Sequence, residues 1–240
     1  MMRARDFRKR ARMVLSGNWF VAVIAGIIAS FFGASAGATV NFNFNYNFGL
    51  PDVDDNTQNV AHVISQNIPD EVKPIIMGMG LFAIVFSLIT LILGSVIAIG
   101  YAEFNLDLVD HYKPKLSTLF KHFRQTKSAI GVSLLIFIKV FVGSIFFILP
   151  GVIASYQYSM THYIMADNPG ITARDAMYRS KELMKHNKWR LFCLDTSFIG
   201  WGLLGLITFG IADYWLHPYR SAARAAFYRE IRRESEAFSW

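Results

Sequence analysis

The sequence predicts an all-α membrane protein, a polytopic helical bundle of about six transmembrane helices in three hairpins with short interfacial amphipathic helices. Hydrophobic residues make up 53% of the 240 residues, against about 45–50% in ordinary soluble domains. Residues 18–40 and 74–102 are uncharged and exceed the ~20 residues that a helix needs to cross a bilayer. Most lysines and arginines lie in the segments that flank such runs, which predicts that both termini are cytoplasmic.

Residues 1–17 predict a basic amphipathic helix on the inner surface of the membrane. Its bases alternate with apolar residues at helical spacing, and each base near an anionic surface contributes about 1 kcal/mol. A solvated positive anchor fits the same pattern. The expected headgroup contacts in this helix are Arg8, Arg10 and Arg12.

The first predicted span covers residues 18–40. Its basic start and small Ala34-Ser35-Ala36 end also fit a secretory signal peptide, but the apolar run is longer than a signal core, so we expect the span to be retained. A small-residue stripe of Gly26, Ser30, Gly33 and Gly37 includes a Gly33-xxx-Gly37 pair, which favours close packing against another helix and self-association.

Residues 41–73 form the predicted external loop. Asparagine alternates with aromatic residues at its start, which fits an extended strand or, as we favour, an interfacial segment whose rings rest on the headgroups. The second span, residues 74–102, has a proline near its first turn. The basic residues 103–127 then form a cytoplasmic linker with an amphipathic helix after Pro114.

The central hairpin has legs at residues 128–149 and 152–166, and Pro150-Gly151 between them predicts a tight turn. Tyrosines make the return leg polar for a lipid-facing helix, so we expect it inside the bundle. Residues 167–190 follow as a second basic cytoplasmic linker with an amphipathic helix. In this linker, Lys181 and Lys185 are the expected headgroup contacts.

Residues 191–208 and 211–227 repeat the hairpin pattern, because both hairpins read turn, Ile-Ala, any residue, Tyr, over 151–156 and 210–214. Such repeats are common in transporters, and they also arise by duplication without transport. The six-span region therefore covers residues 18–230, with residues 231–240 as a cytoplasmic tail. Arg224 is a further expected headgroup contact.

Orientation follows from the bases. The N-terminal segment carries 6 lysines and arginines, the two linkers 5 and 6, and the segment from Arg220 onward 5, whereas the external loop has only Lys73. The positive-inside rule places the base-rich segments in the cytoplasm.

Five separated motifs occur in this order: ARMVLSGNW, LPGVIASYQYSM, YIMADNP, SFIGWGLLGLITFGI and PYRSAARAAFYRE. With them, the chain from Arg10 to Glu230 resembles the bacterial integral-membrane family known as domain of unknown function 975. The resemblance implies a multi-pass protein of the bacterial cytoplasmic membrane, and it implies no activity.

A few polar residues within the predicted spans are candidates for chemistry. Lys139 lies mid-span, where a charge is costly, so it should pair with Asp195 or, as a second choice, Asp213. An ion or proton relay is one interpretation, and a structural pair or a snorkelling lysine is favoured. Asp213 and His217 share a helical face, which fits a metal or proton site or, as favoured, a capped turn with an interfacial histidine. The expected polar cluster is Lys139, Asp195, Asp213, His217, Tyr156 and Tyr163.

The sequence contains no catalytic triad order, HExxH motif or phosphate loop, so we expect no enzyme and no cofactor or metal. The net charge of +7 is interleaved with spans, which argues against nucleic-acid binding. The favoured function is a non-catalytic, oligomeric scaffold or accessory protein that binds anionic lipid or a membrane-protein partner. The alternative is a small-solute or ion permease with a polar cavity between the two C-terminal hairpins.

Overall fold

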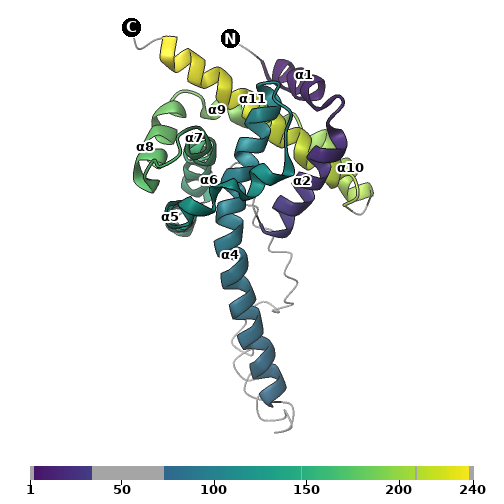
Figure 1. The fold of residues 1–240 in the computed structure, drawn as a ribbon. Helices are drawn as coiled ribbons and strands as arrows, with labels where there is room; N and C mark the ends of the chain where they lie inside the picture. The colour runs from purple at the N-terminus through teal and green to yellow at the C-terminus, as the bar shows by residue number, and fades with distance from the viewer. Residues whose placement is uncertain (1–2, 34–72, 147, 209, 238–240) are drawn as a thin grey trace. The chain divides into compact units, whose positions relative to one another are not determined.

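The computed structural model describes residues 3–33, 73–146, 148–208 and 210–237. Every regular element in these ranges is a helix, which confirms the predicted all-α class (Figure 1). Contacts group the chain into two compact units, residues 1–40 with 91–240 and residues 41–90.

Parts of five predicted segments lie outside the described residues. They are residues 1–2 of the basic helix, residues 34–40 of the first predicted span with Gly37, the external loop up to residue 72, residue 147 of the central hairpin, and the last three residues of the tail.

The N-terminal segment forms α1 (Ala4–Leu15) and α2 (Trp19–Phe31), which meet at an angle of 107°. The predicted amphipathic helix is present as α1, and its apolar face, including Phe7 and Leu15, is buried. The predicted small-residue stripe is present only in part, because Gly26 is buried in α2 but Ser30 is exposed and Gly33 lies beyond the end of the helix with a φ of +68°. The buried face of α2 consists of Ala22, Ala25, Gly26 and Ala29.

Helix α4 (Lys73–Val109) contains the second predicted span and continues beyond it. It passes the expected exit near residue 103 because Phe104, Leu108 and other apolar residues keep packing in the core of the first unit. The next segment is the 3-10 helix η1 (Leu116–Gln125), at the position of the predicted linker helix. It contacts α4 closely, since a β-carbon on Gly100 would lie 2.3 Å from the Leu119 carbonyl oxygen.

Helices α5 (Thr126–Phe146) and α6 (Ile148–Gln157) form the central hairpin and pack side by side. The predicted Pro150-Gly151 turn is wrong, because both residues lie in the first turn of α6. A proline is tolerated in the first turn of a helix, where its missing N–H would be unpaired in any residue. Gly151 brings α6 close to α5, since a β-carbon there would lie 2.1 Å from the Ser144 hydroxyl oxygen.

Two predicted spans are each divided into two helices. The return leg at 152–166 consists of the end of α6 and of α7 (Thr161–Asp167), and residues 191–208 are covered by α9 (Lys188–Thr196) and α10 (Ile199–Ile207). At the second break, the Ser197 hydroxyl donates to the Leu194 carbonyl at 2.6 Å.

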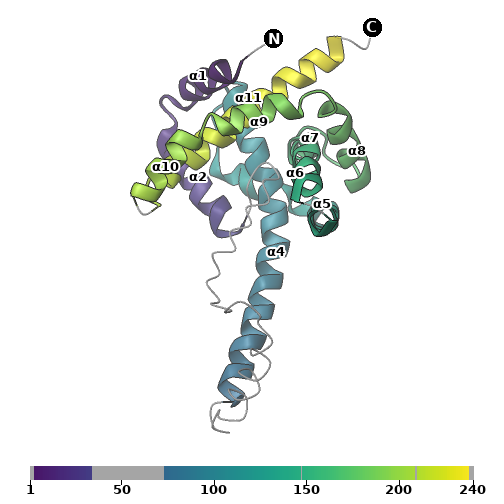
Figure 2. The ribbon, with the colours of Figure 1, turned by 180° about the vertical axis from the view of Figure 1, so that it is seen from behind.

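Helix α11 (Asp213–Ala237) runs through the middle of the first unit. Helices α1, α2, α9 and α10 lie along it, and Figure 2 shows them from behind. Between α7 and α9, helix α8 (Ala173–Leu183) is capped at its N-terminus by Thr172, whose hydroxyl accepts from the Asp175 N–H at 3.2 Å. The two copies of the predicted repeat differ locally, because Gly210 has a φ of +86° in a turn whereas Gly151 is helical.

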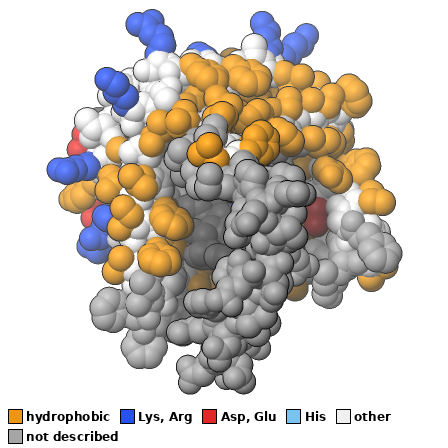
Figure 3. Space-filling model, turned by 90° about the horizontal axis from the view of Figure 1, so that it is seen from below, with side chains coloured by type: hydrophobic (Ala, Val, Ile, Leu, Met, Phe, Trp, Pro, Cys, Tyr) orange, Lys and Arg blue, Asp and Glu red, His pale blue; other side chains and the backbone are white. Residues whose placement is uncertain are grey.

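The first unit exposes many large apolar side chains. Figure 3 shows them gathered over one face, with lysines and arginines at its margin. Exposed members include Phe20 and Phe31 of α2, Phe137 and Phe141 of α5, and Ile153 of α6. Exposed apolar surface on this scale is typical of membrane or protein contacts.

Two helical stretches, Ile92–Val109 and Leu116–Ser144, are long and apolar enough to cross a membrane. The bent pair of α1 and α2 raises the number to three if it counts as one span. Both statements concern the described residues.

Candidate functional site

A buried ion pair connects α11 to α9. The Arg224 guanidinium donates to both carboxylate oxygens of Asp195, from Nε at 3.0 Å and from Nη2 at 2.7 Å. The side chains are 4% and 13% exposed, so both charges are largely removed from solvent. Parallel N–H···O bonds of this kind fix orientation as well as adding energy.

Two tyrosines of the predicted polar cluster lie around this ion pair. The Tyr156 hydroxyl is close enough to the Asp195 carboxylate to interact with it. Tyr163 is fully buried, donates to the Ser221 carbonyl at 3.4 Å, and stacks on Tyr228 with ring centroids 5.5 Å apart. Asp195, Tyr156 and Tyr163 thus gather around Arg224, which the sequence analysis assigned to headgroups.

A second polar cluster joins the ends of α4 and α7 to α11. Arg229 donates to Asp110 at 2.5 Å and to Asp167 at 2.7 Å, and Arg232 donates to Asp167 at 2.5 Å. The Tyr228 hydroxyl also donates to Asp167, at 2.9 Å. Burial raises the pKa of Tyr228, which lies just beyond the sixth predicted span, and the Asp167 carboxylate raises it further, so the phenol stays a donor.

Asp213 and His217 share α11 but meet different neighbours. The Asp213 carboxylate packs on Gly205 of α10, where a β-carbon would lie 2.6 Å from Oδ1. The His217 ring stacks on Tyr101 of α4 with centroids 5.4 Å apart, and its Nδ1 lies 3.3 Å from the Tyr101 hydroxyl. Across the described part of the chain, no three His, Cys, Asp or Glu side chains are grouped to hold a metal ion.

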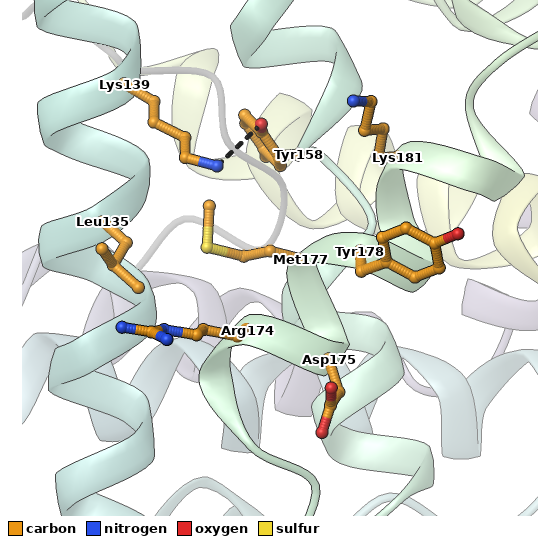
Figure 4. Close-up of a pocket in the computed structure, with 8 residues that line it drawn as sticks. All are labelled: Leu135, Lys139, Tyr158, Arg174, Asp175, Met177, Tyr178 and Lys181. Carbon is orange, nitrogen blue, oxygen red and sulfur yellow. Dashed lines mark hydrogen bonds between the residues drawn. The ribbon is translucent and has the colours of Figure 1, made fainter.

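Lys139 lies on the exposed side of α5, in a pocket between α5 and α8 (Figure 4). Its Nζ donates to the Tyr158 hydroxyl at 3.2 Å and lies 4.9 Å from the centre of that ring. The expected pair of Lys139 with Asp195 is therefore replaced by two other contacts, Lys139 with Tyr158 and Asp195 with Arg224.

We call this pocket the α5–α8 pocket. Its cavity volume is about 470 Å³. It is lined by Leu135, Lys139, Tyr158, Arg174, Asp175, Met177, Tyr178 and Lys181.

The predicted headgroup contacts have different environments. Arg12, Lys181 and Lys185 are exposed, and Arg8 and Arg10 are partly exposed. The assignment of Arg224 to headgroups is wrong, because its guanidinium is buried against Asp195.

Sequence reasoning missed Tyr158 and Arg174 as pocket residues and Asp110, Asp167 and Arg229 as a cluster. These residues lie in, or directly after, different helices, so no spacing along the chain connects them. The only available signal was the position of Asp110 and Asp167 at the ends of apolar runs.

Over the residues that the structure describes, the fold is all-helical and includes two or three helices that could cross a membrane. Residues 145–235 match the family described as "Protein of unknown function (DUF975)", so this part of the chain is a domain of unknown function 975. The match runs from the end of α5 into α11 and includes four of the five motifs quoted above. No curated protein and no solved structure matches the chain.

Replacing Lys139 with methionine is expected to change the free energy of unfolding by no more than about 1 kcal/mol. The lysine is exposed, and its contacts are one hydrogen bond and one ring. The shift in apparent Tm of the purified protein in detergent would measure the effect, with Asp195→Asn as the comparison. A loss as large as that of Asp195→Asn would show that Lys139 is part of a tightly coupled polar group.

Proposed function

We propose that this chain is a multi-pass protein of the bacterial cytoplasmic membrane, with six spans and both termini inside. In this proposal it is a non-catalytic, oligomeric scaffold or accessory protein that binds anionic lipid or a membrane-protein partner. As a scaffold it presents binding surfaces to lipid or to a partner protein, and its interior polar groups stabilise the fold.

The observation that carries the proposal is that polar side chains in the interior bind one another. A permease would be expected to present Tyr156, Tyr163 and Asp195 to a water-filled path. In the structure, Asp195 is bound by Arg224 through two hydrogen bonds, and Tyr163 is fully buried. Such an arrangement supports a fixed bundle.

The surface supports the membrane part of the proposal. Apolar side chains are exposed on α2, α5, α6 and α10, while α1 and α8 carry exposed bases such as Arg12 and Lys181. An apolar belt beside basic helices matches a bilayer core beside an anionic inner surface. The exposed rings of α2, Phe20 and Phe31, offer a contact for a second copy or for a membrane-protein partner.

Reporter fusions test the topology. We expect a periplasmic-type reporter to be active at Val60 and inactive at Lys115, at Lys181 and after Trp240. The physical reason is the retention of base-rich segments on the cytoplasmic side. An active periplasmic reporter at Lys181, or a mature chain that begins after Ala36, would contradict the six-span arrangement.

A density map of the purified protein in lipid nanodiscs, combined with solute flux in liposomes, tests the scaffold. A ring of protomers with lipid between them and a dry interior around Arg224 is the expected result. A continuous water path lined by Tyr156, Tyr163 or Asp195, together with solute flux, would contradict the scaffold function and support a permease.

A further inference from the structure

The α5–α8 pocket lies between a helix that could cross a membrane and a short amphipathic helix. α8 packs on α5 where both helices carry small residues, since a β-carbon on Gly131 would lie 3.5 Å from that of Ala173. Beyond this contact the helices enclose the pocket, whose volume of about 470 Å³ is in the usual range for a small-ligand site.

Three cations line this pocket with one carboxylate. Lys139 comes from α5, and Arg174 and Lys181 come from α8. Asp175 is engaged at the start of α8, where its carboxylate accepts from the Thr172 hydroxyl at 2.7 Å. Figure 4 shows its carboxylate turned away from Lys139 and Lys181.

The charged side chains of this pocket are exposed, and their partners differ from those of the buried or partly buried charges of the first unit. Arg224 and Arg229 are bound by carboxylates of other helices. Within the described residues, no ion pair neutralises Lys139, Arg174 or Lys181. The Lys139 ammonium is held in place by Tyr158, which contributes a neutral acceptor and a ring face. A phosphate group is a suitable partner for such cations, because Arg and Lys form charge-assisted hydrogen bonds with its oxygens.

We propose that the α5–α8 pocket binds the phosphate group of an anionic phospholipid, held by Lys139, Arg174 and Lys181. Arginine and lysine together suit phosphate, since the guanidinium provides a fork of donors and the ammonium a compact charge. Basic pockets beside membrane helices bind phospholipid headgroups in this way. The proposal rests on the membrane placement proposed above and names the lipid-binding site.

The surroundings favour a lipid over free phosphate. Exposed apolar side chains of α5, Leu134, Ile138 and Phe141, flank the pocket residues Leu135 and Lys139 along the helix. They provide a surface for acyl chains beside Lys139 on the same helix. A free phosphate ion would use the cations and leave this apolar surface uncovered.

Native mass spectrometry of the full chain in detergent, titrated with phosphatidylglycerol or phosphatidylcholine, tests the site. The variant Arg174→Gln/Lys181→Gln should weaken phosphatidylglycerol binding about 25-fold, from about fivefold per base removed. Lys139→Gln should weaken it about fivefold by the same reasoning. The matched control, Lys113→Gln/Arg179→Gln, removes one lysine and one arginine from exposed positions that lie outside the pocket and outside the expected headgroup contacts, and it should change the affinity little.

The outcomes separate the pocket from the wider proposal. If the control pair weakens phosphatidylglycerol binding equally, the α5–α8 pocket is not the binding site, and lipid binds diffusely to the basic surface. Equal affinity of the wild type for both lipids would contradict the proposed binding of anionic lipid. Full displacement of phosphatidylglycerol by millimolar inorganic phosphate would identify free phosphate as the ligand and contradict the assignment of a phospholipid.

A second measurement needs no variant. The wild type is crosslinked with a phosphatidylglycerol that carries a photoactivatable headgroup, and the modified peptides are mapped. Modification around Lys139 and within α8 is the expected result. Modification confined to α1 would overturn the pocket as the site.

Discussion

Replacing Asp195 with alanine is expected to destabilise the protein by about 3–5 kcal/mol, because it leaves the buried Arg224 charge without its partner. The Arg224 side chain is only 4% exposed, and both of its hydrogen bonds to this carboxylate would be lost. Removing Arg224 alone should cost a similar amount, since the Asp195 carboxylate would then lack its counterion. The free energy of unfolding, measured by SDS titration in mixed micelles, gives the size of both losses.

A double-mutant cycle shows whether the two charges act as a pair. Asp195→Leu combined with Arg224→Met replaces the ion pair by apolar side chains, which is often neutral or stabilising for a buried pair. We therefore expect the double variant to recover most of the stability that each single variant loses. Additive losses would show that the two residues stabilise the fold independently.

Replacing Gly100 with alanine is expected to displace η1 from α4 and to cost about 1–3 kcal/mol, the usual range for overpacking. The added β-carbon would lie 2.3 Å from the Leu119 carbonyl oxygen and 2.7 Å from the Leu119 Cα. Both are backbone atoms, so no side-chain rotation relieves the clash. We expect the effect toward the upper end of this range, measured as the loss of unfolding free energy in micelles.

Gly200 provides a matched control in α10. A β-carbon there meets no atom within 4 Å, so Gly200→Ala should be neutral or slightly stabilising through helix propensity. Equal losses for the two alanine variants would contradict a specific contact between α4 and η1. Increased protease sensitivity of residues 110–125 in the Gly100 variant alone would locate the disturbance at η1.

The helical class and the positions of most helices could be predicted from the sequence, because apolar runs and helical spacing are local properties. The amphipathic face of α1 is an example, since Phe7 and Leu15 are buried as its pattern indicates. The domain family could be recognised as well, because its motifs are continuous stretches of chain.

The positions at which helices end and the chain bends could be found only from the structure. Pro150 and Gly151 indicate a turn when read locally, yet they lie in the first turn of α6. Gly151 serves close packing on Ser144 there, and a glycine needed for close approach looks the same in a sequence as a glycine needed for a turn. The lengths of α2 and α9 were overestimated for a related reason, because apolar residues continue through the ends of these helices.

The sequence by itself determined that this chain is helical, rich in membrane-length apolar runs and basic between them. Composition and the spacing of apolar residues are local properties that can be read directly from the sequence. Only the tertiary structure decided which charges meet. Arg224 lies 29 residues after Asp195, and Arg229 lies 119 residues after Asp110. Such pairs form when helices pack, and the low polarity of the interior makes each buried charge depend on a partner that no local pattern identifies.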